Sequence, residues 1–144
     1  MKKLITLFLT GLSIAIISVS CTKEDKPTNS ANSIEGTWQF DKKSTVIPDI
    51  PSDEQDINDP SCQYKNYYTF KSGGVLEEGY VKSCILQKLS GDWKKTGDIL
   101  EVNSSDGTKM KYTIASITET KLTLKYYFAQ NSTDIYSQYT LIRK

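Results

Sequence analysis

The sequence contains no histidine and a single arginine, and its 18 basic residues almost balance its 17 acidic ones. Without histidine, the chain lacks the side chain that most often acts as a general base and most often binds zinc, copper or iron. A formal net charge of +1 leaves no excess of Lys and Arg to neutralise the phosphates of a nucleic acid. These absences exclude nucleic-acid binding, His-dependent catalysis and metal sites built on histidine.

The motifs of common enzymes are absent as well. The sequence has no Gly-x-Ser-x-Gly elbow, no Gly-rich phosphate loop with lysine and no Cys-His pair. Glu77 and Glu78 are adjacent, and adjacent residues of a strand point to opposite faces, so they cannot work as a paired acid and base. We therefore expect no catalytic residues, no cofactor and no metal site.

The chain begins with a segment typical of protein export. Lys2 and Lys3 precede an apolar run, residues 4–19, that is shorter than the roughly 20 residues a membrane-spanning helix needs. The tetrapeptide at its end, Ser18-Val19-Ser20-Cys21, resembles a bacterial lipoprotein signal, whose cysteine becomes the lipid-carrying N-terminus. Three cysteines leave one over after pairing, and a thioether on Cys21 removes that spare thiol. We expect residues 1–20 to be removed and Cys21 to be lipidated; ordinary signal-peptide cleavage is the alternative.

Residues 21–33 read as a flexible tether, because beyond the cysteine they include no large apolar side chain that a core could bury. Within them, Lys23-Glu24-Asp25 resembles the signal that sends lipoproteins to the outer face of the outer membrane in Bacteroidetes. A solvated charged linker is the alternative interpretation. We expect an outer-membrane lipoprotein, on the periplasmic face or the cell surface, held to the membrane by the lipid on Cys21.

From residue 34 to residue 144 the chain reads as one all-β domain. Short runs rich in Tyr, Thr, Ile, Val and Leu alternate with clusters of Gly, Asn, Asp and Ser, and nothing reads as a helix. Short links between consecutive strands favour neighbouring hairpins, and eight such strands avoid exposed edges best by closing into an antiparallel up-and-down barrel. The expected strands are 36–42, 63–71, 75–82, 91–96, 98–103, 109–117, 122–129 and 135–143.

A turn centred on Gly73 sets the register of one hairpin and brings Cys62 opposite Cys84. Directly opposed residues of antiparallel strands have Cα atoms about 4.5 to 5.5 Å apart, which a disulfide accepts, and an exported protein meets an oxidising compartment. We expect this disulfide to form and to contribute about 3 kcal/mol by the chain-entropy model. The same register opposes Phe70 to Leu76, Tyr68 to Glu78 and Asn66 to Tyr80.

Alternation along the strands predicts which side chains face inward. Glu78 is a charged residue on the predicted inner face of its hairpin, which is otherwise mainly aromatic. It either reaches an open mouth of the barrel, meets a ligand, or lies at a strand end in water. The side chains expected to face inward are Tyr64, Tyr68, Phe70, Leu76 and Tyr80, then Met110, Tyr112 and Ile114, then Leu122, Leu124, Tyr126 and Phe128.

The first and last strands carry a resemblance to a known family. Gly36-Thr37-Trp38 resembles the Gly-x-Trp opening of the lipocalin superfamily, and the closing strand ends on Arg143. The resemblance implies that Arg143 packs over Trp38 at the closed end of the barrel, where stacking and cation–ring attraction stabilise the pair. Residues 68–74, 90–100 and 121–124 are similar to segments of the lipocalin-like lipoproteins of Bacteroidetes. The chain differs from typical lipocalins in lacking a helix after the barrel.

The function implied by this resemblance is non-catalytic binding of a small hydrophobic ligand inside the barrel. Tyrosine suits such a site, since its ring supplies apolar area and its hydroxyl can hold a polar group. The alternative is that the same side chains only fill a small core. We expect a monomer, with the candidate lining formed by Tyr68, Tyr80, Tyr112, Leu124, Tyr126 and Phe128.

A second function follows from the long segment of residues 43–61. It contains three of the four prolines and several carboxylates, and loops of this length are uncommon unless they are functional or disordered. The resemblance places it over the barrel mouth, with its end pinned by Cys62. The alternative function is therefore a cell-surface module that binds a protein or glycan through this loop, with the protein partner unspecified. Its carboxylates lack the spacing of a calcium loop.

Overall fold

Strands make up most of the chain that the computed structural model describes, which is residues 33–128 and 135–144. The export segment, Cys21, the tether up to residue 32 and the expected turn at 130–134 lie outside the described residues. Within the described part, the one helical element is the single 3-10 turn η1 (Ser72–Gly74), and no helix there is long and apolar enough to cross a membrane. The strands are β1 (Gly36–Val46), β2 (Gln55–Asp56), β3 (Tyr67–Phe70), β4 (Val75–Lys82), β5 (Ile85–Thr96), β6 (Ile99–Ser104), β7 (Lys109–Ile117), β8 (Lys121–Tyr127) and β9 (Tyr136–Arg143).

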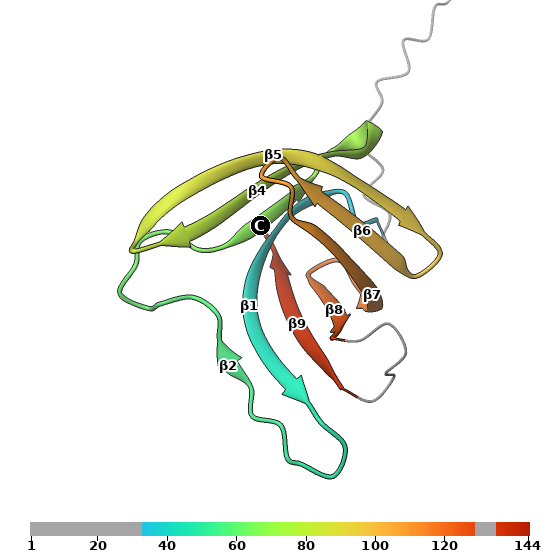
Figure 1. Ribbon diagram of the computed structural model, residues 1–144. Coiled ribbons are helices and arrows are strands. Elements are labelled where there is room, and N and C mark those ends of the chain that lie inside the picture. Colours follow the sequence, from blue (N-terminus) through green and yellow to red (C-terminus); the bar gives the residue numbers. More distant parts are fainter. Residues whose placement is uncertain (1–32, 129–134) are drawn as a thin grey trace, which may run out of the picture.

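The strands close into a ring. Every consecutive pair from β3 to β9 is antiparallel, and β1 pairs with β3 on one side and with β9 on the other. The short strand β2 pairs with β1 outside this ring. The expected eight-stranded antiparallel barrel is thus confirmed, and its strands curve around a common interior in Figure 1.

Two strands are longer than the sequence suggested. β1 continues past Lys42 to Val46, where β9 supplies its hydrogen bonds after a bulge between Phe40 and Lys42. β5 begins at Ile85, not at Gly91, because its first half pairs with β4 alone. Residues 63–66, expected at the start of a strand, precede β3 as irregular chain. β4 and β7 have the expected bounds.

The core lies inside the barrel. Every strand of the barrel wall except β5 contributes large side chains that are almost completely buried. Trp93 on β5 is half-buried and packs against them. Pairs of aromatic rings meet edge to face throughout, which is the favourable geometry for their quadrupoles. The most deeply buried large residues are Trp38, Phe70, Leu76, Leu100, Val102, Leu122, Leu124 and Leu141.

One end of the barrel is closed by Arg143 and Trp38. The guanidinium carbon lies 4.2 Å from the Trp38 ring centre, and the two residues oppose each other across β1 and β9. The guanidinium also donates to the carbonyls of Glu35 (2.8 Å) and Ser33 (2.7 Å), while Trp38 Nε1 donates to the carbonyl of Ile34 (2.7 Å). Gly36 leaves room for this arrangement, because a Cβ there would lie 2.7 Å from an Arg143 nitrogen. The stacking implied by the lipocalin resemblance is present.

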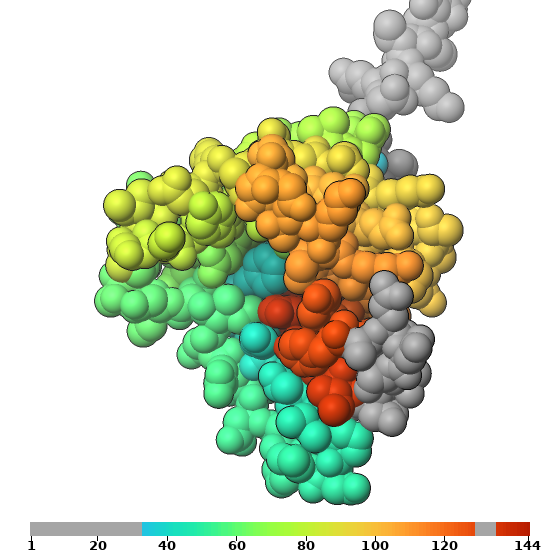
Figure 2. All heavy atoms as spheres, viewed as in Figure 1, coloured from blue at the N-terminus to red at the C-terminus, as the bar shows by residue number. Residues whose placement is uncertain are grey.

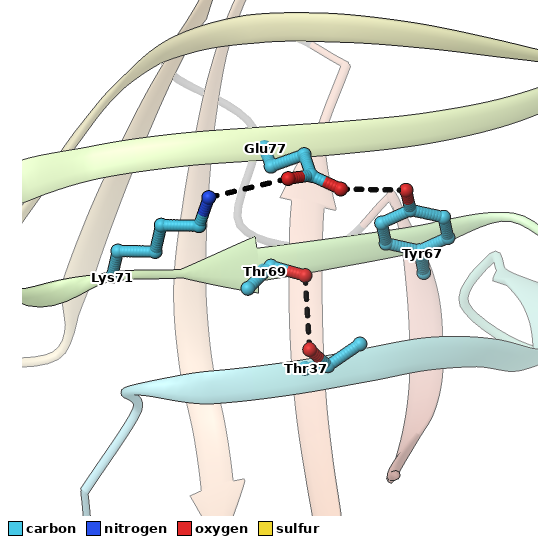
Figure 3. Close-up of polar contacts among 5 residues, drawn as sticks. All are labelled: Thr37, Tyr67, Thr69, Lys71 and Glu77. Carbon is cyan, nitrogen blue, oxygen red and sulfur yellow. Dashed lines mark hydrogen bonds and ion pairs between the residues drawn. The ribbon is translucent and has the colours of Figure 1, made fainter.

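A polar network covers the outer face of β3 and β4. Tyr67 donates a hydrogen bond to Glu77 (2.8 Å), which also pairs with Lys71 at 3.2 Å, and the hydroxyls of Thr37 and Thr69 are 3.0 Å apart (Figure 3). These bonds link β1, β3 and β4 on the side away from the core.

Candidate functional site

A polar cluster lies on the inner wall of the barrel at Glu78. Glu78 is directly opposite Tyr68 in the β3–β4 register, and Tyr68 is 4% exposed, so both side chains face inward. The Ser104 hydroxyl, at the end of β6, donates a hydrogen bond to the Glu78 carboxylate. Across the interior, the hydroxyls of Tyr68 and Tyr112 are 3.4 Å apart. Strands β3, β4, β6 and β7 therefore aim four oxygen-bearing side chains at one region.

Gly91 explains how a residue of β4 reaches one of β6. It lies on the intervening strand β5, opposite Leu76 on one side and Ser104 on the other. A Cβ on Gly91 would lie 2.1 Å from the Asn103 carbonyl oxygen. The absence of a side chain there leaves the strands close together and lets Glu78 and Ser104 meet across β5.

The two inner phenols stay protonated far above neutral pH. Burial is the main cause that raises the pKa of Tyr68, and the neighbouring Tyr112 and Glu78 act in the same direction. Burial also raises the pKa of Tyr112, although the hydrogen bond with Tyr68 opposes this. One bond between two hydroxyls uses one of their two protons, which leaves the other for an acceptor atom.

Aromatic rings surround this cluster. Tyr139 lies 6.1 Å from Tyr112 and 5.9 Å from Phe40, measured between ring centres, and Phe40 lies 4.9 Å from Tyr68. Tyr126 lies 6.1 Å from the Tyr112 ring. Together the rings form a continuous apolar wall around the oxygen atoms.

Four of the six expected lining residues lie on this wall. Tyr68, Tyr112 and Leu124 are buried, and Tyr126 is half-buried against Tyr112. Tyr80 and Phe128 do not lie in the interior.

The prediction of the inner face was wrong for three aromatic residues: Tyr80, Phe128 and Tyr64. Tyr80 is 37% exposed because it follows Gly79, the last β4 residue that β3 pairs with, so no wall continues beside it. Phe128 is 57% exposed and comes after the end of β8 at Tyr127. Tyr64 is exposed in the irregular chain before β3. Alternation identifies the face of a side chain but not whether a barrel wall extends that far.

One of the three interpretations of Glu78, a strand end in water, is wrong. It is the fourth residue of the eight-residue strand β4, half-buried and bonded to Ser104, so it is not at a strand end in water. Phe40, Tyr139 and Ser104 were missed as members of the site. The alternation of Tyr139 with Leu141 on β9 is the signal that would have found Tyr139.

The inner wall contains two further polar groups. Lys43, expected in the loop, belongs to β1 opposite Tyr139, with its Nζ 5.7 Å from the centre of that ring. Ser137, opposite Tyr126, is completely buried, and its hydroxyl has no hydrogen-bond partner among the residues that the structure describes. A buried hydroxyl without a partner is unusual and invites a ligand or a water molecule.

The long segment of residues 47–66 lies along the edge of β1 that β3 leaves free. The Ile57 backbone amide donates to the Asp41 carbonyl (3.1 Å), and the Asn58 side-chain amide donates to the Phe40 carbonyl (2.5 Å). Asn66 then joins the segment to β4, since its side-chain oxygen accepts from the Val81 amide (2.7 Å). In Figure 2 this green and teal segment lies beside the yellow-green β4–β5 hairpin.

The predicted disulfide is confirmed. Cys62 and Cys84 are bonded, with Cα atoms 4.9 Å apart, and they join the segment to the tip of the β4–β5 hairpin. A cleft of about 180 Å³ lies beside the bond, lined by Ile57, Tyr64, Val81 and polar neighbours. Asp59 is near the two sulfurs, but sulfurs bonded to each other offer no thiolate to a metal.

Comparison with known proteins agrees with the barrel. A family model described as a lipocalin-like domain matches residues 34–124. No curated protein matches the chain. A lipocalin-like protein from Bacteroides uniformis is 13% identical, with a TM-score of 0.53 over 76% of this chain and 97% of that one.

Two other solved structures are similar in fold. An uncharacterized protein from Bacteroides eggerthii is 13% identical, with a TM-score of 0.52 over 78% of this chain and 100% of the other. Apocrustacyanin C1 is 16% identical, with a TM-score of 0.50 over 82% of this chain and 64% of that chain. At these identities the similarity shows the fold alone.

Proposed function

This chain belongs to the lipocalin-like domain family, and from that premise we propose that its barrel binds a small hydrophobic ligand without catalysing a reaction. The observation that carries the proposal is the inner wall of aromatic rings around the Tyr68 and Tyr112 hydroxyls. The rings offer apolar area, and a phenol proton can hold one polar atom of the ligand. The Ser137 hydroxyl, which no described residue hydrogen-bonds, offers a second polar contact on the same wall.

Extraction tests this proposal directly. The protein purified from its native membrane is extracted with organic solvent, and the extract is examined by mass spectrometry for a stoichiometric small molecule. We expect one apolar ligand in the extract and displacement of an environment-sensitive apolar dye when that ligand is added back. An empty extract together with no dye binding would refute the proposal.

A matched pair of hydroxyl deletions locates the site. Tyr112→Phe removes a hydroxyl from the inner wall, whereas Tyr67→Phe removes one from the outer face of the same barrel. We expect weaker ligand binding, by about fivefold to tenfold for one lost hydrogen bond, in the first variant only. Equal affinities in the two variants would remove Tyr112 from the site.

The same proposal places the protein at the outer membrane through a lipid on Cys21. As a random coil, residues 22–33 would reach about 20 Å on average and at most roughly 40 Å when stretched, which would keep the barrel close to the membrane surface. We expect the intact mass of the detergent-extracted protein to include the lipid, and Cys21→Ser to release the protein in soluble form. Protease treatment of whole cells separates surface display from the periplasmic face.

An interaction module at the segment of residues 47–66 is the second candidate. Its basis is that this segment and the hairpin tip joined to it by the disulfide each expose apolar side chains, with Ile50 at 58%, Tyr64 at 45% and Ile85 at 61% exposure. We expect Ile50→Ser with Ile85→Ser to abolish capture of a surface protein or glycan while leaving ligand extraction unchanged. Unchanged capture would exclude this surface.

A further inference from the structure

Glu78 is a carboxylate on the aromatic inner wall, and no cation among the described residues pairs with it. The ion pairs between described side chains are Lys42–Asp56, Lys71–Glu77 and Lys111–Glu101, and none includes Glu78. Its protein partner in the described part of the chain is the neutral Ser104 hydroxyl. Glu78 is half-buried, and a charge partly removed from water is costly unless it is paired or hydrogen-bonded, so one neutral hydroxyl compensates it only in part.

The rings near Glu78 are suited to a cation. The faces of aromatic rings carry partial negative charge and attract ammonium groups within about 6 Å of the ring centre. Tyr68 is directly opposite Glu78, and its ring is linked edge to face with Phe40 and from there with Tyr139. Lys43 already places an ammonium 5.7 Å from the Tyr139 centre, which shows that this wall accepts a positive charge.

We infer that Glu78 binds the ammonium group of a small organic cation whose apolar body packs against the inner aromatic rings. This inference rests on the proposed ligand-binding function and specifies the ligand class. The carboxylate supplies a charge-assisted hydrogen bond, which is stronger than a bond between neutral groups. The Ser104 hydroxyl holds the Glu78 carboxylate in place, and the absence of a side chain on Gly91 lets the two residues meet across β5.

Lys43 is the group that opposes this assignment, because it faces the same interior and repels a bound cation. Its position also provides a test of whether the ligand is positively or negatively charged. If the ligand is a cation, removing the Glu78 charge weakens binding and removing the Lys43 charge does not. If the ligand is an anion held by Lys43, the two effects are reversed.

Three probes with the same phenylethyl body distinguish these cases by isothermal titration calorimetry of the purified protein. They are phenethylamine, 2-phenylethanol and 3-phenylpropionate, which are cationic, neutral and anionic at neutral pH. We expect phenethylamine to bind best. Equal or tighter binding of 3-phenylpropionate or 2-phenylethanol would overturn the inference.

Variants then assign the effect to Glu78. We expect Glu78→Gln to weaken phenethylamine binding roughly 10- to 100-fold, and Lys43→Met to leave it unchanged or tighten it. Glu101→Gln is the matched control, since it removes the same charge from the outer face, where Glu101 lies 3.7 Å from Lys111. An unchanged affinity in Glu78→Gln would overturn the inference even if phenethylamine binds.

The outcome also separates this inference from the function on which it rests. If none of the three probes binds but an uncharged apolar molecule is extracted from the protein, the cation assignment is wrong and ligand binding stands. If no probe binds and the extract is empty, both are wrong.

Discussion

At the scale of single residues, Tyr67 shows how an outer-face side chain stabilises the wall. Its ring lies over Gly79, where a Cβ would be only 2.0 Å from a ring carbon. The ring therefore occupies the place of the missing side chain, an arrangement known to compensate glycine in strands. Its hydroxyl donates to Glu77, which also pairs with Lys71 (Figure 3).

This contact predicts a dependence of stability on pH at both extremes. Burial and the bond to Glu77 raise the pKa of Tyr67 to about 12, from an ordinary 10.0. The protonated phenol is favoured in the folded state, so its contribution is complete below pH 10 and is lost as the pH rises to about 12. The bonds from Tyr67 and Lys71 lower the pKa of Glu77 below its ordinary 4.5, so that contribution is complete above pH 4.5 and is lost as the pH falls.

Urea unfolding across the pH range checks this prediction. We expect the midpoint to fall below pH 4.5 and above pH 10, and both changes to be smaller in Tyr67→Phe. The alkaline fall does not vanish in that variant, because Tyr68 and Tyr112 also have raised pKa values. Parallel pH profiles for the two proteins would contradict the role assigned to Tyr67.

At the scale of elements, the β4–β5 hairpin projects beyond the barrel. Residues Ile85 to Leu89 pair with β4 only, since the β5–β6 pairing begins at Gly91. In Figure 1 this end of the hairpin curves away from the other strands. An isolated two-stranded ribbon is marginally stable in water, and the Cys62–Cys84 bond fastens its tip to the segment that follows β1.

Reduction of this disulfide should therefore loosen the hairpin tip first. We expect faster amide hydrogen exchange at residues 80–89 and at 57–66, and a loss of about 3 kcal/mol in the free energy of unfolding. Exchange rates of oxidised, reduced and Cys62→Ala with Cys84→Ala protein provide the measurement. Equal acceleration at residues 57–66, at residues 80–89 and over β7 to β9 would show that the bond acts on global unfolding alone and that the hairpin tip does not loosen first.

The hairpin also shows what the sequence could and could not predict. The register around Gly73 was correct, because glycines adopt the positive φ values of the turn (73° at Gly73) and buried Phe70 faces Leu76. The same register found the disulfide. The first half of β5 was missed because residues 85–90 face solvent largely on both sides and show no clear alternation. The end of β1 was missed for a related reason: residues 43–46 were expected in the loop, and only pairing with β9 beyond a bulge makes them strand.

The candidate site was predicted to a similar extent. Tyr68, Tyr112 and Leu124 follow from alternation within single strands. The contact between Glu78 and Ser104 spans 26 residues and depends on Gly91 between two strands, so local pattern gives no signal for it.

At the scale of the whole molecule, Arg143 secures the closure of the ring. It belongs to the last strand, stacks on a tryptophan of the first, and donates to the carbonyls of Ser33 and Glu35. The fork geometry of the guanidinium allows both bonds while the group stays stacked, which an ammonium cannot reproduce.

We expect Arg143→Met to lower the free energy of unfolding by about 1 to 3 kcal/mol and Arg143→Lys to lower it by a smaller amount. Urea unfolding followed by tryptophan fluorescence measures this, and Trp38 reports the change in its surroundings. Lys94→Met, at an exposed site on β5, is the control for loss of a single positive charge. Equal stability of Arg143→Met and the control would show that the closure depends on the strand ladder alone.

The bond from Arg143 to Ser33 also brings residue 33 and the end of the last strand together, and the Lys144 amide donates to the Thr37 carbonyl (2.9 Å). A short glycine linker from residue 144 to residue 33 would therefore span little distance, and a circularly permuted chain becomes accessible. The turn at Gly107, where nothing lies within 4 Å of an added Cβ, is a suitable place for new termini. Such a permutant would carry its ends at the rim opposite Trp38, where a fused reporter could respond to occupancy of the interior.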